Sequence, residues 1–400
     1  MLSHLAPFLP PAILLGALSS EWCSSSVSRR FFSWVTITAV SLRVILAGSP
    51  YTNPLANYIT GFFAAWYIIW SANLLLVKDL RKLKRIAKQL QSSPTVYVWQ
   101  SLPSSHGRAR FLWAVDLTLN FRAIGWNFSC VQVCHPPITE TQLHTDLDPS
   151  AADKGRPGNL EIGRTAFLQK QVRRLAVSGM WLAGYPVIRG ALRFTFITAA
   201  IPVYAANRGT GSLADLLSVA TTLYMFMDGA QAVVSLVAVE LLSDEIWRYP
   251  PLFGPVETLL SGRLQDVWGK FWHGLLKEGL QATAKASVPW RQPRVLWSLT
   301  RIWMCFILTG AVHAAASYTV SREPLPSLCA GVFYCLQPVG IAIQMAITGA
   351  MRTAMPKSAL SPEAQTVVNY AVGLLWMRYC FPWVTDDPAL RQAIGAIRAI

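Results

Sequence analysis

Residues 56–77 read ANYITGFFAAWYIIWSANLLLV and carry no charged side chain. A helix of about 20 mostly apolar residues is long enough to cross the hydrocarbon core of a bilayer. The next residues, 78–90, read KDLRKLKRIAKQL and are strongly basic. Cytoplasmic loops beside membrane spans are enriched in lysine and arginine. The two segments therefore predict a transmembrane helix that ends on the cytoplasmic side, followed by a segment that can lie on anionic lipid as a basic amphipathic helix.

The composition supports a membrane protein. The chain has 400 residues, of which 53% are hydrophobic and 14% are charged, whereas soluble domains carry about 25% charged residues. A net charge of +15 would suggest nucleic acid in a soluble chain. Here the basic residues lie largely between apolar segments, so we expect contact with the lipid bilayer and not with nucleic acid. The seven cysteines are scattered without a C-x-x-C pair, so we expect neither a disulfide framework nor a metal site.

Other apolar segments extend the pattern along the chain; they occupy residues 5–18, 31–47, 191–206, 218–242, 297–318, 327–351 and 367–384. The first is broken by prolines and is either a retained span or an interfacial helix. Together they predict an all-α polytopic membrane protein, a bundle of about 7–9 transmembrane helices with interfacial helices. We expect a single membrane-embedded domain over residues 1–400, with the N-terminal spans and basic segment in 1–90 and the motif-bearing part in 111–400.

Three ionisable residues lie inside predicted spans, namely Asp228, Arg301 and His313. Such residues are costly in lipid and face the protein interior or a wet cavity. Around His313, small residues such as Gly310 allow close approach of a neighbouring helix or a ligand. Its imidazole can take a proton near neutral pH, as a general base does. The alternative is a histidine that only holds the bundle together, and Asp228 and Arg301 read most simply as internal polar partners.

A second group of polar and aromatic residues lies in GRLQDVWGKFWHGLLKEGL, residues 262–280. Trp268 and Trp272 are four apart and share one face of a helix, which we expect to lie at the membrane interface. One interpretation is an aromatic belt segment. The other is an aromatic-walled entrance to a site, with His273 inside it and Lys270 placed to meet an anionic cofactor.

A third segment, NFRAIGWNF, occupies residues 120–128. Arg122 in it could pair with a phosphate or with Asp116. Alone, this segment is weakly informative.

In their order, the three segments resemble the wax-synthase branch of the membrane-bound O-acyltransferases, which includes fungal acetyltransferases that decorate terpenoids. The first family element is Arg-x-x-Gly-Trp, here RAIGW at 122–126. The second is Pro-Leu-Phe-Gly leading to Phe-Trp-Gly-x-x-Trp-His, here PPLFG at 250–254 and VWGKFWH at 267–273. The third is Ser-Gly-x-x-His, here TGAVH at 309–313. This chain departs from the pattern at Val267, at Phe271, where a second basic residue is often found, and at Thr309.

The resemblance implies transfer of an acyl group, most simply acetyl from acetyl-CoA, to a hydroxyl of a hydrophobic terpenoid or meroterpenoid in secondary metabolism. It implies no permanently bound cofactor and a multi-pass location in the endoplasmic reticulum. His313 would be the base and His273 a second catalytic residue. The acyl-CoA would contact four further residues, namely Lys270, Trp268, Trp272 and Arg122.

Three alternatives stay open at this point. A long-chain wax ester synthase carries the same motifs. A transporter would use His313, Asp228 and Arg301 as an intramembrane relay. A non-enzymatic membrane scaffold would need neither histidine. The sequence does not name the alcohol or the oligomeric state.

Overall fold

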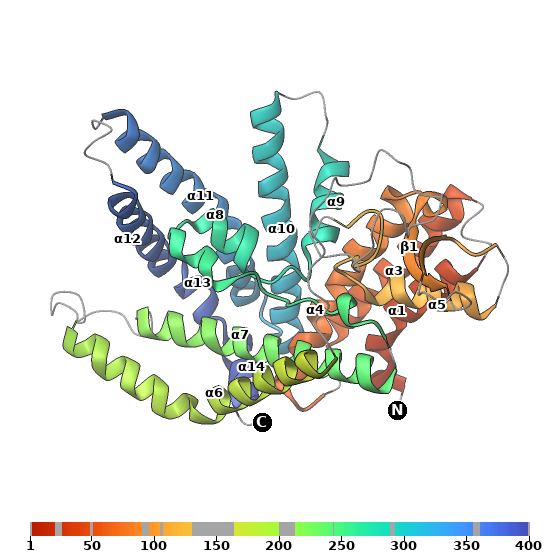
Figure 1. Ribbon diagram of the computed structural model, residues 1–400, viewed down its shortest axis with the longest axis horizontal. Coiled ribbons are helices and arrows are strands. Elements are labelled where there is room, and N and C mark those ends of the chain that lie inside the picture. The colour runs from red at the N-terminus through yellow and green to blue at the C-terminus, as the bar shows by residue number, and fades with distance from the viewer. Residues whose placement is uncertain are drawn as a thin grey trace.

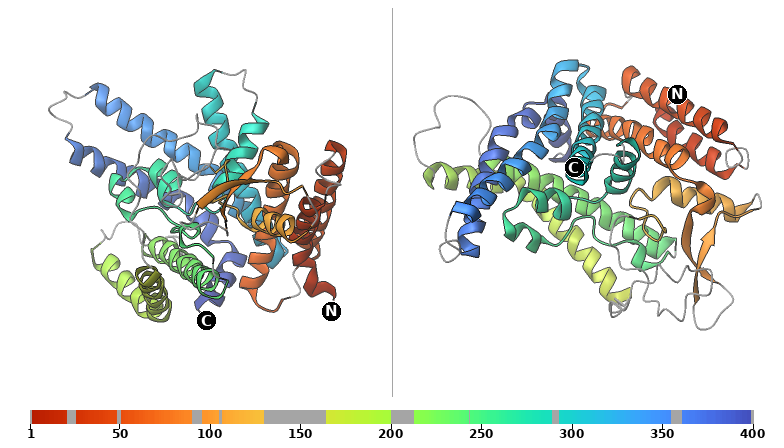
Figure 2. Two further views of the ribbon diagram at one scale, coloured as in Figure 1. Left: turned by 45° about the vertical axis from the view of Figure 1, so that its right-hand side comes forward. Right: turned by 90° about the horizontal axis from the view of Figure 1, so that it is seen from above.

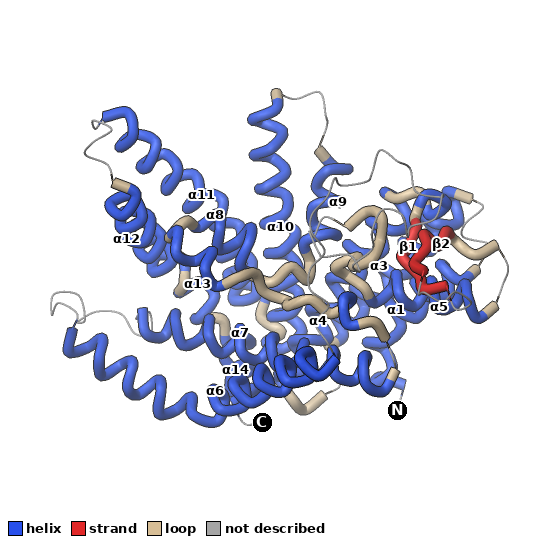
Figure 3. The backbone as a smooth tube through the Cα atoms, viewed as in Figure 1, coloured by secondary structure: helices blue, strands red, loops and turns tan. Residues whose placement is uncertain are grey.

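The computed structural model describes residues 2–20, 26–48, 51–89, 96–104, 107–129, 164–199, 213–242, 244–288, 293–354 and 361–398. Within these ranges the chain is mostly helical, as Figure 1 shows. One two-stranded antiparallel hairpin departs from the all-helical prediction. It lies at the edge of the molecule, beside the N-terminal helices (Figure 3).

Five segments of the described chain are long and apolar enough to cross a membrane; they are Val27–Ala47, Pro54–Val77, Val219–Leu241, Leu296–Ser321 and Pro324–Ala354. They confirm five of the predicted spans. Their outer surfaces carry exposed apolar side chains such as Phe32, Ile307 and Met345, which a bilayer would cover. The chain is therefore an integral membrane protein.

The expectation of about 7–9 spans is only partly met among the described residues. The apolar helix Leu5–Ser19 is too short to count with the other five. The segment 367–384 is divided between two helices at Pro382, a residue that cannot continue the backbone hydrogen bonding of the first helix. The candidate at 191–206 runs past the end of a helix at Ala199 into residues outside the described ranges.

Helix α10 (Arg294–Ser321) stands at the centre of the molecule. It packs against α11 (Pro324–Ala354) on one side and against α4 (Pro54–Ala72) on the other. The view from above in Figure 2 places α10 between the N-terminal helices and the pair formed by α11 and α12 (Pro362–Cys380). A residue on α10 can therefore be reached from both halves of the chain.

The remaining helices surround this centre; they are α1 (Leu9–Ser19), α3 (Val27–Ala47), α5 (Arg108–Leu119), α6 (Arg164–Ala199), α7 (Leu213–Leu236), α8 (Leu264–Asp266), α9 (Lys277–Ser287), α13 (Pro382–Thr385) and α14 (Pro388–Arg398). Helices α6 and α7 pack together along the lower edge of the view in Figure 1. Helix α14 packs against α4, which brings the C-terminal region next to the quoted apolar span.

Helix α4 is well defined by its own sequence. The Asn53 side chain accepts hydrogen bonds from the backbone N–H groups of Leu55 and Ala56 at 2.8 and 3.3 Å, which caps the helix start. Pro54 at the first position needs no hydrogen-bond partner there. The middle of α4 is buried because the stacked rings of Trp66 and Trp70 form the centre of the largest apolar core.

The basic segment after α4 is not the helix that its composition allows. Residues 84–89 form strand β1 (Lys84–Gln89), paired with β2 (Val96–Ser101). The free edge of β1 is held by the RAIGW segment, because Ile86 N–H donates to the Gly125 carbonyl at 2.8 Å. Asn127 N–H donates to the Lys84 carbonyl at 3.0 Å. These partners come from more than thirty residues away, so tertiary contact overrides local helical preference.

Candidate active site

The RAIGW segment forms a tight turn that is fixed by its backbone conformation and by aromatic packing. Ala123 and Gly125 adopt positive φ values of 51° and 77°. A side chain at Gly125 would lie 2.9 Å from the Trp247 ring. Trp126 is buried and packs edge-on against Trp113 at 5.0 Å between ring centroids. The motif therefore makes a compact anchor beside the hairpin.

Arg122 connects this anchor to the PPLFG segment. Its Nη1 and Nη2 donate to the carbonyls of Pro250 and Pro251, each at 2.9 Å. The residue is 9% exposed, and burial lowers the pKa of its guanidinium to about 10. A buried arginine at neutral pH is still charged, and two carbonyl oxygens partly offset the loss of water. In this structure Arg122 holds a loop, and its predicted contact with acyl-CoA stays a prediction.

The PPLFG loop in turn lies directly on the Trp-His segment. Gly254 N–H donates to the Phe271 carbonyl at 2.9 Å, and Gly274 N–H donates to the Leu252 carbonyl at 3.1 Å. A Cβ at Gly254 would overlap the Lys270 carbonyl oxygen. Only glycine permits this approach, so the motif fixes where residues 271–274 run.

The Trp-His segment itself is a short helix that ends in a π-helical turn, and not the continuous interfacial helix expected from its sequence. Helix α8 passes into the π turn Val267–Phe271, closed by Trp272 N–H on the Val267 carbonyl at 2.7 Å. A π turn is a frequent feature of functional sites, because it redirects the chain within a helix. The chain then leaves the helix at Trp272 and carries His273 into the interior.

His273 sits among aromatic rings. The ring centroids of Trp272 and Phe253 lie 5.4 and 6.0 Å from that of the imidazole. Nδ1 is buried and has no hydrogen-bond partner among the described residues. Burial, with a smaller contribution from the Arg122 charge, lowers the pKa of His273 to about 4. This imidazole is therefore neutral at pH 7 and keeps one buried nitrogen available for a ligand.

His313 lies where α10 and α11 come closest together. A Cβ at Gly310 would be 2.6 Å from the Gly331 carbonyl, and one at Gly331 would be 3.0 Å from the Gly310 carbonyl. The approach allows the Tyr334 ring of α11 to stack on the imidazole at 4.1 Å. The small residues around His313 thus serve helix packing, one of the two uses that the sequence allowed.

The other side of the His313 imidazole is supplied by α4. The Phe62 ring meets it edge-on at 5.3 Å. The Tyr58 hydroxyl lies 3.0 Å from Nδ1. These contacts hold the ring and leave Nε2 as the nitrogen that can meet a substrate.

The two histidines belong to one site. Their imidazoles are close enough to interact electrostatically. The Trp268 ring is close to the neighbours of both histidines. Its centroid lies 6.1 Å from that of Trp272, which precedes His273, and 6.3 Å from that of Tyr334, the residue stacked on His313. The structure therefore assembles a mainly aromatic site around two imidazoles, from α4, α10, α11 and the Trp-His segment.

Lys270 is the predicted site residue that lies apart. Its Nζ pairs with the buried carboxylate of Asp266 at 2.8 Å, and its side chain is 61% exposed. Asp266 is also paired with Arg263 at 2.8 Å. The lysine thus faces outward from the turn, where a soluble anion can reach it, and its role in binding acyl-CoA stays a prediction.

Two contributors to the site were not singled out in the sequence. Tyr58 belongs to a span for which the sequence predicts only a membrane crossing. Tyr334 belongs to another predicted span without charged residues. Each is one of several aromatic residues in an apolar run, so the sequence offers no signal that separates them from lipid-facing rings. Their part in the site depends on how α4 and α11 pack against α10.

The other intramembrane charges have separate partners. Asp228 forms an ion pair with Arg174 of α6. The Arg301 guanidinium lies over the Trp297 ring at 4.3 Å. In the described part of the chain, no contact links either residue to His313, so the relay of the transporter alternative is not assembled there.

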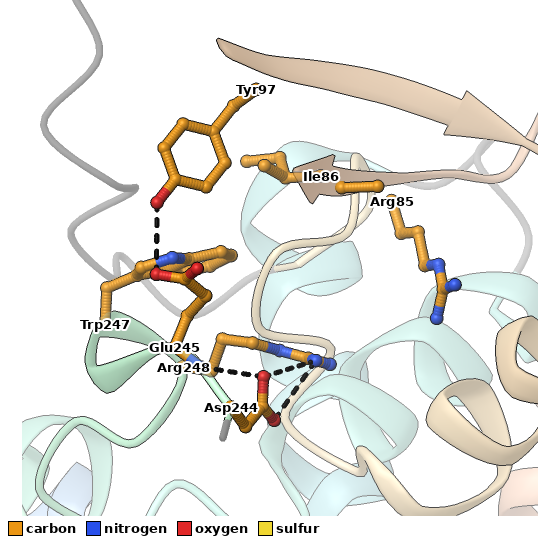
Figure 4. Close-up of a pocket in the computed structure, with 8 residues that line it drawn as sticks. Arg85, Ile86, Tyr97, Asp244, Glu245, Trp247 and Arg248 are labelled. Carbon is orange, nitrogen blue, oxygen red and sulfur yellow. Dashed lines mark hydrogen bonds and ion pairs between the residues drawn. The ribbon is translucent and has the colours of Figure 1, made fainter. Parts of the chain in front are cut away.

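A separate cavity of about 200 Å³ lies between the hairpin and residues 244–248 (Figure 4). The Tyr97 hydroxyl donates to Glu245 at 3.1 Å, and Arg248 pairs with Asp244. None of the six predicted site residues lines it. Among the described residues there is also no cluster of histidine, cysteine and acidic side chains that could hold a metal ion.

Residues 249–336, which contain both histidines, match the model of a family described as "Membrane bound O-acyl transferase family". A curated relative, Acetyltransferase atnC from Arthrinium sp, is 25% identical over 168 residues, which are 40% of this chain and 36% of that protein. The chain therefore matches only about a third of that relative's length. No solved structure is a significant match.

Proposed function

We propose that the protein is an O-acyltransferase that transfers an acyl group from acyl-CoA to the hydroxyl of a hydrophobic alcohol. The observation that carries this proposal is the pair of imidazoles in one aromatic site, within the segment that matches the O-acyltransferase family. A buried neutral histidine can accept a proton, and aromatic walls accommodate an apolar acceptor.

In the proposed reaction, His313 Nε2 removes the hydroxyl proton while the alcohol oxygen attacks the thioester carbonyl. The carbonyl oxygen becomes an oxyanion, and a donor aimed at it lowers the barrier. The buried Nδ1 of His273 can supply that donor when it carries the imidazole proton. Collapse of the intermediate forms the ester and breaks the carbon–sulfur bond. The CoA sulfur leaves with the proton held by His313, which returns to the neutral state.

We propose acetyl as the acyl group and a terpenoid or meroterpenoid alcohol as acceptor. The relative named as an acetyltransferase supports this choice over a long-chain wax ester synthase. The acceptor would reach the site from the lipid, since an apolar alcohol partitions there. The donor would approach from the side of Lys270, whose exposed ammonium attracts the CoA phosphates. We further propose that the protein resides in the endoplasmic reticulum membrane.

The test is acyl transfer in microsomes from a host that lacks the activity. Acetyl-CoA and a long-chain acyl-CoA are offered in turn with terpenoid and fatty alcohols. We expect an ester from acetyl-CoA, and a loss of at least about 10²-fold in His313→Ala, because general-base catalysis contributes that much.

Thr300→Ala is the matched control. Thr300 lies on the same helix, and its hydroxyl donates to the Leu296 carbonyl one turn earlier. Substantial turnover in His313→Ala at normal expression would remove His313 from the base role. Ester from the long-chain donor alone would identify a wax ester synthase. If neither donor reacts with any alcohol while reconstituted vesicles show proton-coupled flux, the transporter alternative replaces the proposal.

A further inference from the structure

The hydrogen bond between the Tyr58 hydroxyl and Nδ1 of His313 is compatible with a proton on either imidazole nitrogen. A neutral imidazole carries one proton, so one nitrogen donates and the other accepts. If the Tyr58 hydroxyl donates to Nδ1, the proton sits on Nε2, and that nitrogen cannot act as a base. A base at Nε2 requires the opposite arrangement, in which Nδ1–H donates to the Tyr58 oxygen. The Tyr58 hydroxyl proton must then go to another acceptor.

Asp387 offers such an acceptor. The residue is 1% exposed and lies immediately before α14. Its Oδ1 accepts from the Ser317 hydroxyl at 2.8 Å and from Ala389 N–H at 3.1 Å. Its Oδ2 is buried and has no hydrogen-bond partner among the described residues. An unsatisfied buried acceptor costs free energy, so a donor for Oδ2 would stabilise this region.

The fold brings this carboxylate to Tyr58. Ser317 is one helical turn after His313 on α10, so Asp387 contacts α10 directly beside the histidine. Tyr58 packs against two apolar clusters that include residues of α14, the helix that Asp387 precedes. Tyr58 and Asp387 are also close enough to interact electrostatically. No direct hydrogen bond joins the Tyr58 hydroxyl to Oδ2 among the described residues, so a link between the two groups needs one bridging water molecule.

We propose that Asp387 and Tyr58 are positioning residues that fix the tautomer of His313 by a hydrogen-bonded relay. Tyr58 donates its hydroxyl hydrogen bond toward Oδ2 of Asp387 through one water molecule and accepts Nδ1–H of His313, which leaves the Nε2 lone pair free for the substrate. When His313 takes the substrate proton, the Asp387 charge, transmitted through Tyr58, stabilises the imidazolium. The catalytic consequence rests on the proposed function, whereas the tautomer does not.

The charge state of Asp387 sets the direction of the relay. Burial raises the pKa of its carboxyl, while the hydrogen bonds from Ser317 and from Ala389 N–H oppose that rise. The start of α14 also favours a negative charge, because helix N-termini carry partial positive charge. A protonated Asp387 would reverse the relay and place the His313 proton on Nε2, so the direction can be measured.

The simpler role for Asp387 is that of a helix cap alone. Asparagine caps helices about as well as aspartate, so Asp387→Asn keeps the cap and removes the charge. Tyr58→Phe removes the hydroxyl and keeps the ring. Asp386→Asn is the matched control, because Asp386 is the neighbouring acid, its side chain is 58% exposed and it pairs with Arg391.

The first measurement needs no activity. In protein labelled with ¹³C,¹⁵N-histidine, nitrogen–carbon correlation spectra distinguish Nδ1, bonded to Cγ, from Nε2, bonded to Cδ2. The His313 signals are assigned by their loss in His313→Gln. We expect a protonated Nδ1 in the wild type and in Asp386→Asn, and a shift of the proton to Nε2 in Asp387→Asn. A wild-type proton on Nε2, or no change in Asp387→Asn, would overturn the relay.

The second measurement is kinetic. We expect Asp387→Asn and Tyr58→Phe each to lower kcat by about 10²-fold with little change in the KM for acetyl-CoA, since they act on the base and not on donor binding. The double variant should be no worse than either single one, because both interrupt the same relay. Effects that multiply, or an Asp387→Asn variant like wild type, would contradict it. A wild type without acyl transfer would remove the proposed function, and the spectra would still decide the tautomer.

Discussion

Two regions of the molecule treat buried polar groups in opposite ways. Beneath the β1–β2 hairpin, Asp116 pairs with both Arg248 at 2.5 Å and Arg85 at 3.4 Å, and Arg248 pairs in turn with Asp244. Each of these four charges has a partner of opposite sign. Around the two histidines, the ring neighbours are aromatic, and the nearby charges of Arg122 and Asp387 form no ion pair with each other. Polar atoms such as His273 Nδ1 have no hydrogen-bond partner among the described residues.

The difference separates a region whose paired charges stabilise the fold from a region whose side chains can still accept or donate a proton. A paired charge cannot change partners without a large cost, so the hairpin cluster fixes geometry. An imidazole with an open nitrogen can take or give a proton when a substrate arrives. Arg122 joins the regions, since it is part of the anchor against the hairpin and holds the loop beside His273.

The largest expected effect comes from breaking the charged cluster. Asp116→Ala leaves Arg85 and Arg248 without their shared carboxylate, and the loss of one member of a buried pair costs about 3 kcal/mol of unfolding free energy. Activity per folded molecule should stay near wild type. Thermal unfolding in detergent and turnover normalised to folded protein measure the two quantities.

The control for this variant is Asp386→Ala. Its partner Arg391 is 53% exposed, and an exposed pair contributes about 0–1 kcal/mol. If both variants lose the same stability, the hairpin cluster has no special structural role and the contrast between the two regions fails.

The next effect tests how strictly the PPLFG loop positions the site. In Gly254→Ala the new Cβ would overlap the Lys270 carbonyl oxygen, so the loop and His273 must shift. A misplacement of about 1 Å can cost about 10²-fold in rate, and we expect a loss of that size in kcat/KM.

Gly269→Ala is a close control, because this glycine lies in the π turn itself and a Cβ there meets nothing within 4 Å. We expect it to retain most of its activity. Equal losses in the two variants would show that the turn, and not the contact at Gly254, is what the site requires.

The third effect is on the pH dependence of stability. Burial holds the pKa of His273 at about 4, against about 6.5 in an unfolded chain. The unfolded state binds this proton first, so stability is present above pH 6.5 and is lost as the pH falls toward 4. Between pH 7 and pH 5 the loss from this residue should be about 2 kcal/mol.

His273→Gln should flatten this part of the stability curve. Unfolding midpoints of wild type and variant, measured across this pH range in one detergent, give the comparison. Parallel curves would mean that His273 is charged or accessible in the folded protein, which is contrary to the uncharged character assigned to the site.

The smallest effect concerns Lys270, the cation at the outer edge of the site. Lys270→Ala should raise the KM for acyl-CoA about threefold and change kcat less, because an exposed ion pair with a phosphate contributes under about 1 kcal/mol. Lys285→Ala, an exposed lysine on α9, is the control. An unchanged KM in Lys270→Ala would place the donor elsewhere.

The sequence predicted much of the fold because bilayer insertion is a local requirement. A span needs only enough consecutive apolar residues, so residues 56–77 and four other segments could be recognised one at a time. The basic segment at 84–89 was wrongly expected to be helical, because its strand depends on Gly125 and Asn127, whose contacts no local pattern contains.

The sequence motifs point to His273, His313, Trp268 and Trp272, and the fold brings these four residues together. Their catalytic and binding roles remain predictions. Tyr58 is 255 residues from His313 in the chain, and nothing in an apolar run marks one tyrosine among several aromatic residues.

By itself, the sequence determined that this chain crosses the membrane and which residue types could support acyl transfer, because hydrophobic length and functional groups are properties of single segments. Only the tertiary structure decided which groups meet. The fold brings the Tyr58 hydroxyl to Nδ1 of His313, directs the Arg122 guanidinium to two backbone carbonyls and buries Asp387 beside α10. These contacts depend on how helices pack, and packing joins segments that the sequence keeps far apart.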